Sequence, residues 1–256
     1  MSAIRAIARM VMTEIFREKD FHVVFILIGL ILFYAAGLQF YDVKHIVRYL
    51  LEIGLMLIFL FSAVLTVTLA ARQVPSEIQS RTVHPLLAKP VSRAQFVLGK
   101  YFGVLFAGVS AFSIFYGLFV ILAWSKSGAL STTVAVQTYF LFVLNLTVLA
   151  AMASAFSYVL TVSANVSISL IVYVLISTYG AGLKATGAHF GPVLRWICEI
   201  VYYLLPHFEF FDLRSRFVHG WGALSPSLLA VLALYAFFYS IFFILLAWVA
   251  FRRRPL

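Results

Sequence analysis

Charged side chains are scarce in this sequence. Only 11% of its 256 residues are Asp, Glu, Lys or Arg, whereas 64% are hydrophobic. Soluble domains carry about 25% charged residues, so this composition cannot cover a water-facing surface and predicts an integral membrane protein. The net charge of +10 does not indicate a nucleic-acid partner. The basic residues lie beside apolar runs, where they orient the chain and contact membrane lipid.

Cysteine is nearly absent, and so are the motifs of ATP-binding and zinc-dependent enzymes. Cys198 is the single cysteine, which excludes an intrachain disulfide and a thiolate metal cluster. Gly99-Lys100 resembles the end of a phosphate-binding loop, but G-x-x-x-x-G-K-[ST] requires a glycine and a hydroxyl where Ala94 and Tyr101 stand. H-E-x-x-H is missing as well. We therefore expect no catalytic residues, no metal and no cofactor in this chain.

Long apolar runs without strict alternation predict membrane-spanning helices, because each backbone polar group in lipid needs an internal partner. No charged residue occurs in 127–183, a stretch too long for one crossing, and TVSAN at 161–165 offers small hydrogen-bonding side chains for a turn. The expected fold class is an all-α integral membrane protein with six transmembrane helices. Their predicted ranges are 22–40, 53–71, 101–124, 137–160, 164–183 and 227–250.

Basic residues set the predicted orientation. With both termini inside, the inner segments hold twelve of the nineteen Lys and Arg residues and the outer segments hold seven. This bias follows the excess of basic residues in short cytoplasmic loops. An odd number of spans would place Arg252-Arg253-Arg254 outside. We therefore expect cytoplasmic termini, a cytoplasmic loop at 72–100 and an outer loop at 184–226.

Residues 2–19 predict an amphipathic helix before the first span, because apolar and polar side chains recur on different faces. The apolar positions are Ile4, Ile7, Ala8, Val11 and Ile15, and the polar positions are Arg5, Arg9, Thr13 and Arg17. We expect the helix to lie in the inner interface with its basic side toward lipid headgroups or a partner. A simple anchor for the first span is the alternative.

A polar segment separates the second and third predicted spans. Pro75 is expected to end the preceding helix, and Ser92 with Gln95 has the form of a capping box that starts the next one. Arg93 and Lys100 would then reach the inner headgroups. The segment of about 28 residues is longer than a connector needs, and it predicts a docking surface.

The segment contains the pattern E-x-x-x-R-T-x-x-x-L-L-A-x-P-x-S-R-x-x-F-x-x-G-K-Y-x-G. It is formed by Glu77, Arg81, Thr82, Leu86, Leu87, Ala88, Pro90, Ser92, Arg93, Phe96, Gly99, Lys100, Tyr101 and Gly103. This pattern resembles the cytoplasmic loop of ABC-2 type transporter permeases. The N-terminal helix, the six spans and the outer loop extend the resemblance over nearly the whole chain, a single permease domain at 1–256. Within the family, the chain is similar to the small permeases of nitrous-oxide-reductase maturation and gliding-motility exporters.

The resemblance implies a membrane subunit of an exporter in a bacterial-type inner membrane. In that family the loop forms a coupling helix that docks on a separate ATPase subunit, which holds the ATP and magnesium. A second permease chain, forming a homodimer, is the other implied partner. The residues to which the resemblance assigns ATPase coupling are Glu77, Arg81, Thr82, Leu86, Leu87, Pro90, Arg93, Gly99 and Lys100.

The spans lack the charged residues that proton- or sodium-driven carriers place near the membrane midplane. Their many aromatic side chains favour an amphiphilic or hydrophobic substrate over an inorganic ion. Asn145 is the candidate for substrate contact, with interhelical hydrogen bonding as the alternative. Other possible functions are a membrane anchor that recruits a partner without transport, and a permease that serves metal-site or sulfur-species assembly. A membrane-embedded enzyme is the least favoured, because no nucleophile, base and acid occur together in the spans.

The outer loop at 184–226 carries scattered His and carboxylate residues among many aromatic ones. His207, Glu209, Asp212 and His219 lack the dense spacing of metal ligands. We expect an aromatic cap at the outer surface, with a short helix at 190–205.

A stripe of small residues at Gly99, Gly103, Ala107 and Ala111 predicts close packing of the third span within one subunit or between two.

Overall fold

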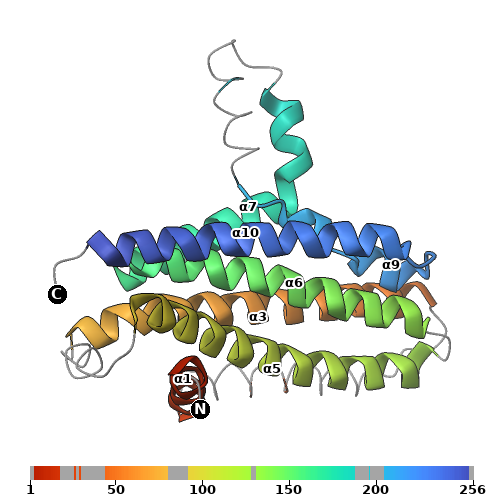
Figure 1. Ribbon diagram of the computed structural model, residues 1–256. Helices are drawn as coiled ribbons and strands as arrows, with labels where there is room; N and C mark the ends of the chain where they lie inside the picture. The colour runs from red at the N-terminus through yellow and green to blue at the C-terminus, as the bar shows by residue number, and fades with distance from the viewer. Residues whose placement is uncertain are drawn as a thin grey trace.

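The computed structural model describes residues 3–17, 26, 29, 44–79, 92–127, 131–187, 196 and 205–253. This part of the chain is helical and contains no strand. Four long helices run side by side (Figure 1): α3 (Lys44–Gln79), α5 (Arg93–Ser127), α6 (Thr132–Ser157) and α10 (Pro226–Arg253). Helix α7 (Val162–Gly187) contacts α3 and α6, and α1 (Ala3–Arg17) packs against α5.

Four of the described helices are long and apolar enough to cross a membrane, which makes this a multi-pass membrane protein. They are Leu51–Gln73, Arg93–Ser125, Thr132–Ser157 and Pro226–Arg252, and they match the second, third, fourth and sixth predicted spans. The fifth matches a shorter apolar helix, Val162–Thr178. The first, at 22–40, lies outside the described residues except for the helical Ile26 and Gly29. The total of six spans therefore stays a prediction.

The prediction that Pro75 ends the helix of the second span is wrong, although the span itself ends at Gln73, close to its predicted end. Helix α3 continues through Pro75 to Gln79. Proline removes one backbone N–H donor, and this close to the end of a helix few later turns depend on that hydrogen bond. Ala70, Ala71 and Gln73 are buried, so packing holds the helix in place up to this point.

The break inside the uncharged stretch exists but lies a few residues earlier than predicted. Helix α6 ends at Ser157 and α7 begins at Val162, so Asn165 belongs to the first turn of α7. Its Nδ2 atom donates a hydrogen bond to the Ala153 carbonyl at 2.9 Å, and Ser169 Oγ donates one to Asn165 Oδ1 at 2.9 Å. A polar side chain from α7 thus closes the hairpin by bonding to the backbone of α6.

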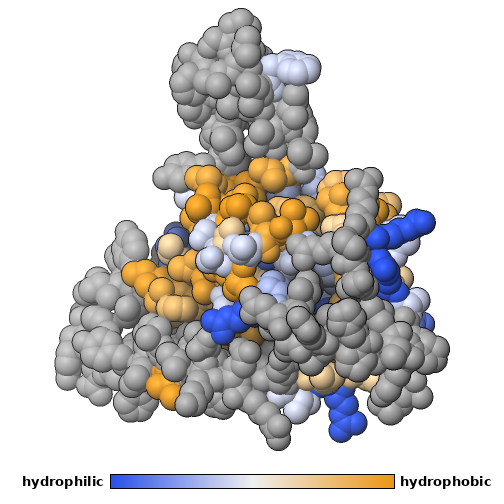
Figure 2. Space-filling model, turned by 90° about the vertical axis from the view of Figure 1, so that its left-hand side faces the viewer, coloured by the Kyte–Doolittle hydropathy of each residue, from blue (hydrophilic) through white to orange (hydrophobic). Residues whose placement is uncertain are grey.

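Aromatic side chains fill the core between α3, α5 and α6. Phe59 stacks on Phe142 with ring centroids 3.8 Å apart, and Phe112 lies 4.5 Å from Phe142 on the same measure. Helix α10 instead leaves large apolar side chains such as Phe237 and Phe238 exposed, as expected for a lipid-facing surface. Figure 2 views the molecule from the left-hand side of Figure 1. Among its coloured residues, hydrophobic ones gather in the upper middle, and the most hydrophilic ones lie at the right, near the lower edge and left of centre.

The long outer loop is partly described and contains two short helices. The 3-10 helix η1 (Phe208–Phe211) contacts α6 and α7, and α9 (Arg214–His219) contacts α3 and α6. In Figure 1, α9 lies at the right-hand end of the bundle, away from the end where α3 finishes and α5 begins. The predicted helix at 190–205 lies outside the described residues except for the helical Trp196 and the non-helical Leu205.

Candidate functional site

The predicted coupling residues divide into a described group and an undescribed one. Arg93, Gly99 and Lys100 lie at the start of α5, and Glu77 lies in the last turn of α3. The other coupling residues lie outside the described part of the chain, and their role in docking stays a prediction. They are Arg81, Thr82, Leu86, Leu87 and Pro90. The structure does describe the residues that flank them.

The capping box predicted at the start of α5 is confirmed. Gln95 N donates a hydrogen bond to Ser92 Oγ at 3.2 Å, and Ser92 N donates one to Gln95 Oε1 at 3.0 Å. The two side chains thereby satisfy backbone donors that have no partner within the helix. This reciprocal pair fixes where the chain enters the third span.

Arg93 ties the first turn of α5 to the last turn of α10. Its Nη1 atom donates hydrogen bonds to the carbonyl oxygens of Phe251 at 3.2 Å and of Arg252 at 3.0 Å. The guanidinium also lies 5.6 Å from the centroid of the Phe251 ring. A cation at a helix C-terminus satisfies free carbonyls and is attracted by the helix dipole. The contact therefore stabilises the end of α10.

Lys100 ties α5 to α3. Its side chain is only 5% exposed, and Nζ donates a hydrogen bond to Gln73 Oε1 at 2.9 Å. The ammonium also lies 5.8 Å from the Phe96 ring centroid. The expectation that Lys100 reaches the lipid headgroups is therefore wrong, because its charge points into the helix interface. Burying a charge is costly unless it is paired, and the hydrogen bond to Gln73 offsets part of that cost.

Gly99 and Gly103 let α1 approach α5 closely. A Cβ atom added at Gly99 would lie 2.8 Å from Ile7 Cβ, and one at Gly103 would lie 2.6 Å from Val11 Cβ. Real Cβ atoms do not approach so closely, so only glycine fits at these two positions. The small-residue stripe thus serves packing within one subunit. Ile7, Ala8 and Val11 form the buried face of α1, as predicted, but they face protein.

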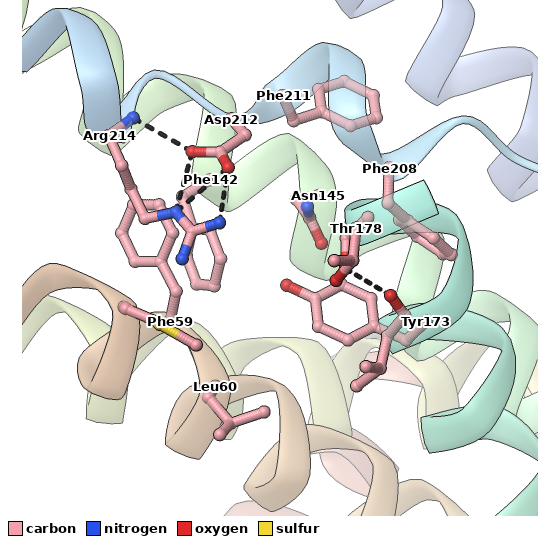
Figure 3. A pocket seen from close by; sticks show the side chains of 13 residues that line it. Phe59, Leu60, Phe142, Asn145, Tyr173, Thr178, Phe208, Phe211, Asp212 and Arg214 are labelled. Carbon is pink, nitrogen blue, oxygen red and sulfur yellow. Dashed lines mark hydrogen bonds and ion pairs between the residues drawn. The ribbon is translucent and has the colours of Figure 1, made fainter. Parts of the chain in front are cut away.

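A cavity of about 80 Å³ lies between the middle of the bundle and the outer loop, because its lining combines Asn145, from the middle of α6, with Phe208 and Asp212 of the loop. Figure 3 shows its walls, which come from α3, α6, α7 and η1 and include Phe59, Phe142, Phe208 and Phe211. Asn145 points into this space from α6, beside the hydroxyl of Tyr173. The Asn145 side chain is 3% exposed, and its Oδ1 atom has no hydrogen-bond partner among the described residues.

An ion pair closes the rim of the cavity. Arg214 Nη2 lies 2.6 Å from Asp212 Oδ2, and Arg214 Nε lies 2.9 Å from Asp212 Oδ1. Burial works against the charge of Arg214, but the hydrogen bond and the charge of Asp212 outweigh it and raise the guanidinium pKa above its ordinary value. The two residues form an ion pair and together add no net charge to the cavity.

The other polar residues of the outer loop hold it in place. His207 Nδ1 lies 3.0 Å from Tyr235 Oη on α10, and burial lowers the His207 pKa although the charge of Glu209 opposes this. Gln137 Nε2 donates to the Leu224 carbonyl at 3.0 Å, while Leu224 N donates to Gln137 Oε1 at 2.8 Å. Within the described ranges, His, Cys, Asp and Glu nowhere form a group of three or more that could hold a metal ion.

A family model for ABC-2 family transporter proteins matches residues 2–256. The chain belongs to the ABC-2 transporter family. No curated protein matches the sequence. As an ABC-2 protein it is a transmembrane component of an ABC transporter, a setting that includes an ATPase partner. The narrower resemblance to the nitrous-oxide-reductase and gliding-motility permeases stays a prediction.

Sequence reasoning missed the partners that hold the ABC-2 chain together at both ends. No rule of sequence spacing relates these contact residues to their partners. The residues are Gln73, Phe251 with its carbonyl, and Gln137. Lys100 and Gln73 are 27 positions apart, and Arg93 and Phe251 are 158 apart. A polar residue at the end of an apolar run is the one signal in the sequence that points to Gln73. It does not indicate which residue Gln73 contacts.

Proposed function

We propose that this ABC-2 protein is the permease subunit of an ATP-driven exporter. Two copies would work with two ATPase subunits, and those subunits would hold ATP and magnesium while this chain supplies no catalytic residue. Both termini and the α3–α5 connection would face the cytoplasm of a bacterial-type inner membrane. The substrate would be an amphiphilic or hydrophobic molecule that moves outward as the permease alternates between inward-open and outward-open states.

One observation supports this role most strongly: the α3–α5 connection leads into a cluster of contacts that joins four helices. We call this cluster the inner tie and define it as Arg93, Gly99, Lys100 and Gly103 with their contacts. Arg93 reaches α10, Lys100 reaches α3, and the two glycines hold α1. A displacement of the connection would therefore move these helices together.

The energetics favour movement as a unit over local unfolding. Hydrogen bonds to charged groups contribute about 1.5–3 kcal/mol each, and removing a partner from a buried charge costs more than that net value. Separating α5 from α3 or α10 would break such contacts at Lys100 or Arg93. Rigid-body tilting preserves them, and it is the kind of motion that can open a cavity between two permeases.

A scaffold without transport has less support. An anchor that only recruits a partner needs an exposed docking segment, but it does not need that segment to be connected to several spanning helices. The inner tie supplies such a connection through side chains that occur in the resemblance motif. The aromatic walls of the spans likewise suit an apolar or amphiphilic substrate.

The proposal is tested by isolating the protein with its ATPase in lipid nanodiscs and measuring substrate-stimulated ATP hydrolysis. Glu77→Ala and Arg81→Ala in the docking segment should leave the permease folded and inserted but lower stimulation, by about tenfold each. Arg9→Ala, an exposed change on α1, is the matched control and should change little. Unaltered stimulation and transport in both docking variants would show that these residues do not couple the subunits.

A further inference from the structure

The outer cavity contains a polar atom whose hydrogen-bonding capacity is unused. Asn145 Oδ1 is a strong acceptor, it is buried, and it accepts no hydrogen bond from the described residues. Native structures rarely leave such an atom unpaired, because its desolvation is then uncompensated. The side chain points into the cavity beside Tyr173 of α7 (Figure 3), with which the amide makes a side-chain hydrogen bond. Interhelical bonding therefore accounts for part of the amide, and its Oδ1 atom remains without a partner among the described residues.

The size of the cavity limits what can enter it. An engineered cavity of about 150 Å³ holds one benzene molecule. At about 80 Å³ this cavity is smaller, so it accommodates an end group of a few non-hydrogen atoms. Met56 on α3 and Val174 on α7 line it and are 52% and 41% exposed. The rest of a longer molecule can therefore extend past these two side chains, along the side of the bundle.

The charges at the rim limit the chemistry of that end group. Asp212 and Arg214 are paired with each other, so the cavity offers neither a free carboxylate for an ammonium nor a free cation for an anion. An ionised carboxylate also has no proton to donate to the acceptor Asn145 Oδ1. A neutral hydrogen-bond donor fits, because it can donate to Asn145 while its carbon atoms contact the phenylalanine walls.

We propose that the outer cavity binds the hydroxyl end of a neutral, membrane-borne amphiphile, with Asn145 Oδ1 as the acceptor for that hydroxyl. This proposal names the class of substrate, and in that respect it rests on the proposed export function. Binding itself needs only the permease chain. The two can therefore fail separately.

The test uses the full-length permease alone, in lipid nanodiscs, with two photoreactive probes of equal chain length. One probe is a diazirine-bearing long-chain alcohol and the other is its methyl ether, which cannot donate a hydrogen bond. The alcohol should crosslink to peptides that line the cavity, with an apparent affinity about tenfold higher than that of the ether. Excess unlabelled alcohol should compete with it.

Asn145→Leu removes the acceptor at similar volume and should abolish the preference for the alcohol. Val174→Trp, at an exposed position of the cavity mouth, should reduce crosslinking of both probes. Thr147→Val is the matched control on the same helix, because its hydroxyl bonds to the Leu144 carbonyl within α6 and does not line the cavity. It should behave like the unmodified protein.

Equal crosslinking by alcohol and ether, or a preference that survives Asn145→Leu, would overturn the inference and would indicate that water serves Asn145. Specific binding without stimulation of the assembled ATPase complex would support the site but contradict export of this class of molecule. Export of another substrate, with no alcohol bound at the cavity, would contradict the site and leave the exporter proposal standing.

Discussion

The two ends of the helix bundle are held together by different chemistry. At the inner end, charged side chains donate to acceptors on neighbouring helices, and glycines allow close backbone contact. At the outer end, the ion pair of Asp212 and Arg214 joins two residues of the same loop, whereas neutral amide and aromatic contacts link the loop to the spanning helices beside a cavity with an unpaired acceptor. Charge-assisted contacts are strong and directional, whereas neutral ones are weaker. The inner end is thus suited to transmit movement, and the outer end to admit a ligand.

The comparison predicts the largest loss of stability from a change at the inner end. Gln73→Leu removes one acceptor of the buried Lys100 ammonium and should lower the free energy of unfolding by about 2 kcal/mol, the value of a hydrogen bond to a charged group. Thr68→Val is the control on the same helix, because its hydroxyl bonds only to the Val64 carbonyl. Denaturant titration in detergent measures both variants. Equal stability of the two would show that the Lys100 contact contributes little.

Overpacking at the α1–α5 contact should produce an effect of similar size. Gly103→Ala places a Cβ atom 2.6 Å from Val11, which forces the helices apart and should cost about 2 kcal/mol. Gly117→Ala is the matched change on α5, because no atom lies within 4 Å of its added Cβ. It should be neutral or slightly stabilising. A similar thermal shift for both alanines would contradict the described approach of α1.

The sequence predicts those features of the inner end that depend on neighbouring residues. The capping box of Ser92 and Gln95 spans four residues and was predicted correctly. The predicted helix end at Pro75 is wrong, because a proline near the end of a helix removes a hydrogen bond on which few later turns depend. The partners of Lys100 and Arg93 could not be predicted, since they depend on how distant helices are packed. For the same reason, the sequence pointed to Asn145 but not to its cavity, whose walls come from four separate elements.

A smaller effect is expected from the neutral contact that holds the outer loop. Gln137→Leu removes two hydrogen bonds to the backbone of Leu224, which is half-buried and can bond to water instead, so the cost should be about 1 kcal/mol. Limited proteolysis of the outer loop is the sensitive measurement, with the exposed change Thr133→Val as control. A loss as large as that of Gln73→Leu would remove the contrast between the two ends.

The smallest effect is a pH dependence at the outer end. Burial lowers the pKa of His207 below its ordinary value of 6.5, so the unfolded chain binds a proton more readily than the folded one. Stability should therefore be complete above the unfolded pKa and decrease as the pH falls below it. Unfolding temperatures measured between about pH 8 and pH 5 test this. His207→Phe should flatten that part of the profile, and an unchanged profile would assign the dependence to other groups.

The most direct test of the account is whether Arg93 transmits the action of the ATPase to α10. In the assembled complex, Arg93→Leu should preserve subunit association and ATP binding but reduce substrate-stimulated ATP hydrolysis about tenfold or more, because α10 loses its connection to α5. Arg252→Gln removes a neighbouring exposed arginine whose side chain lies over Trp248 and should keep nearly full stimulation. Full stimulation in the Arg93→Leu complex would contradict the account.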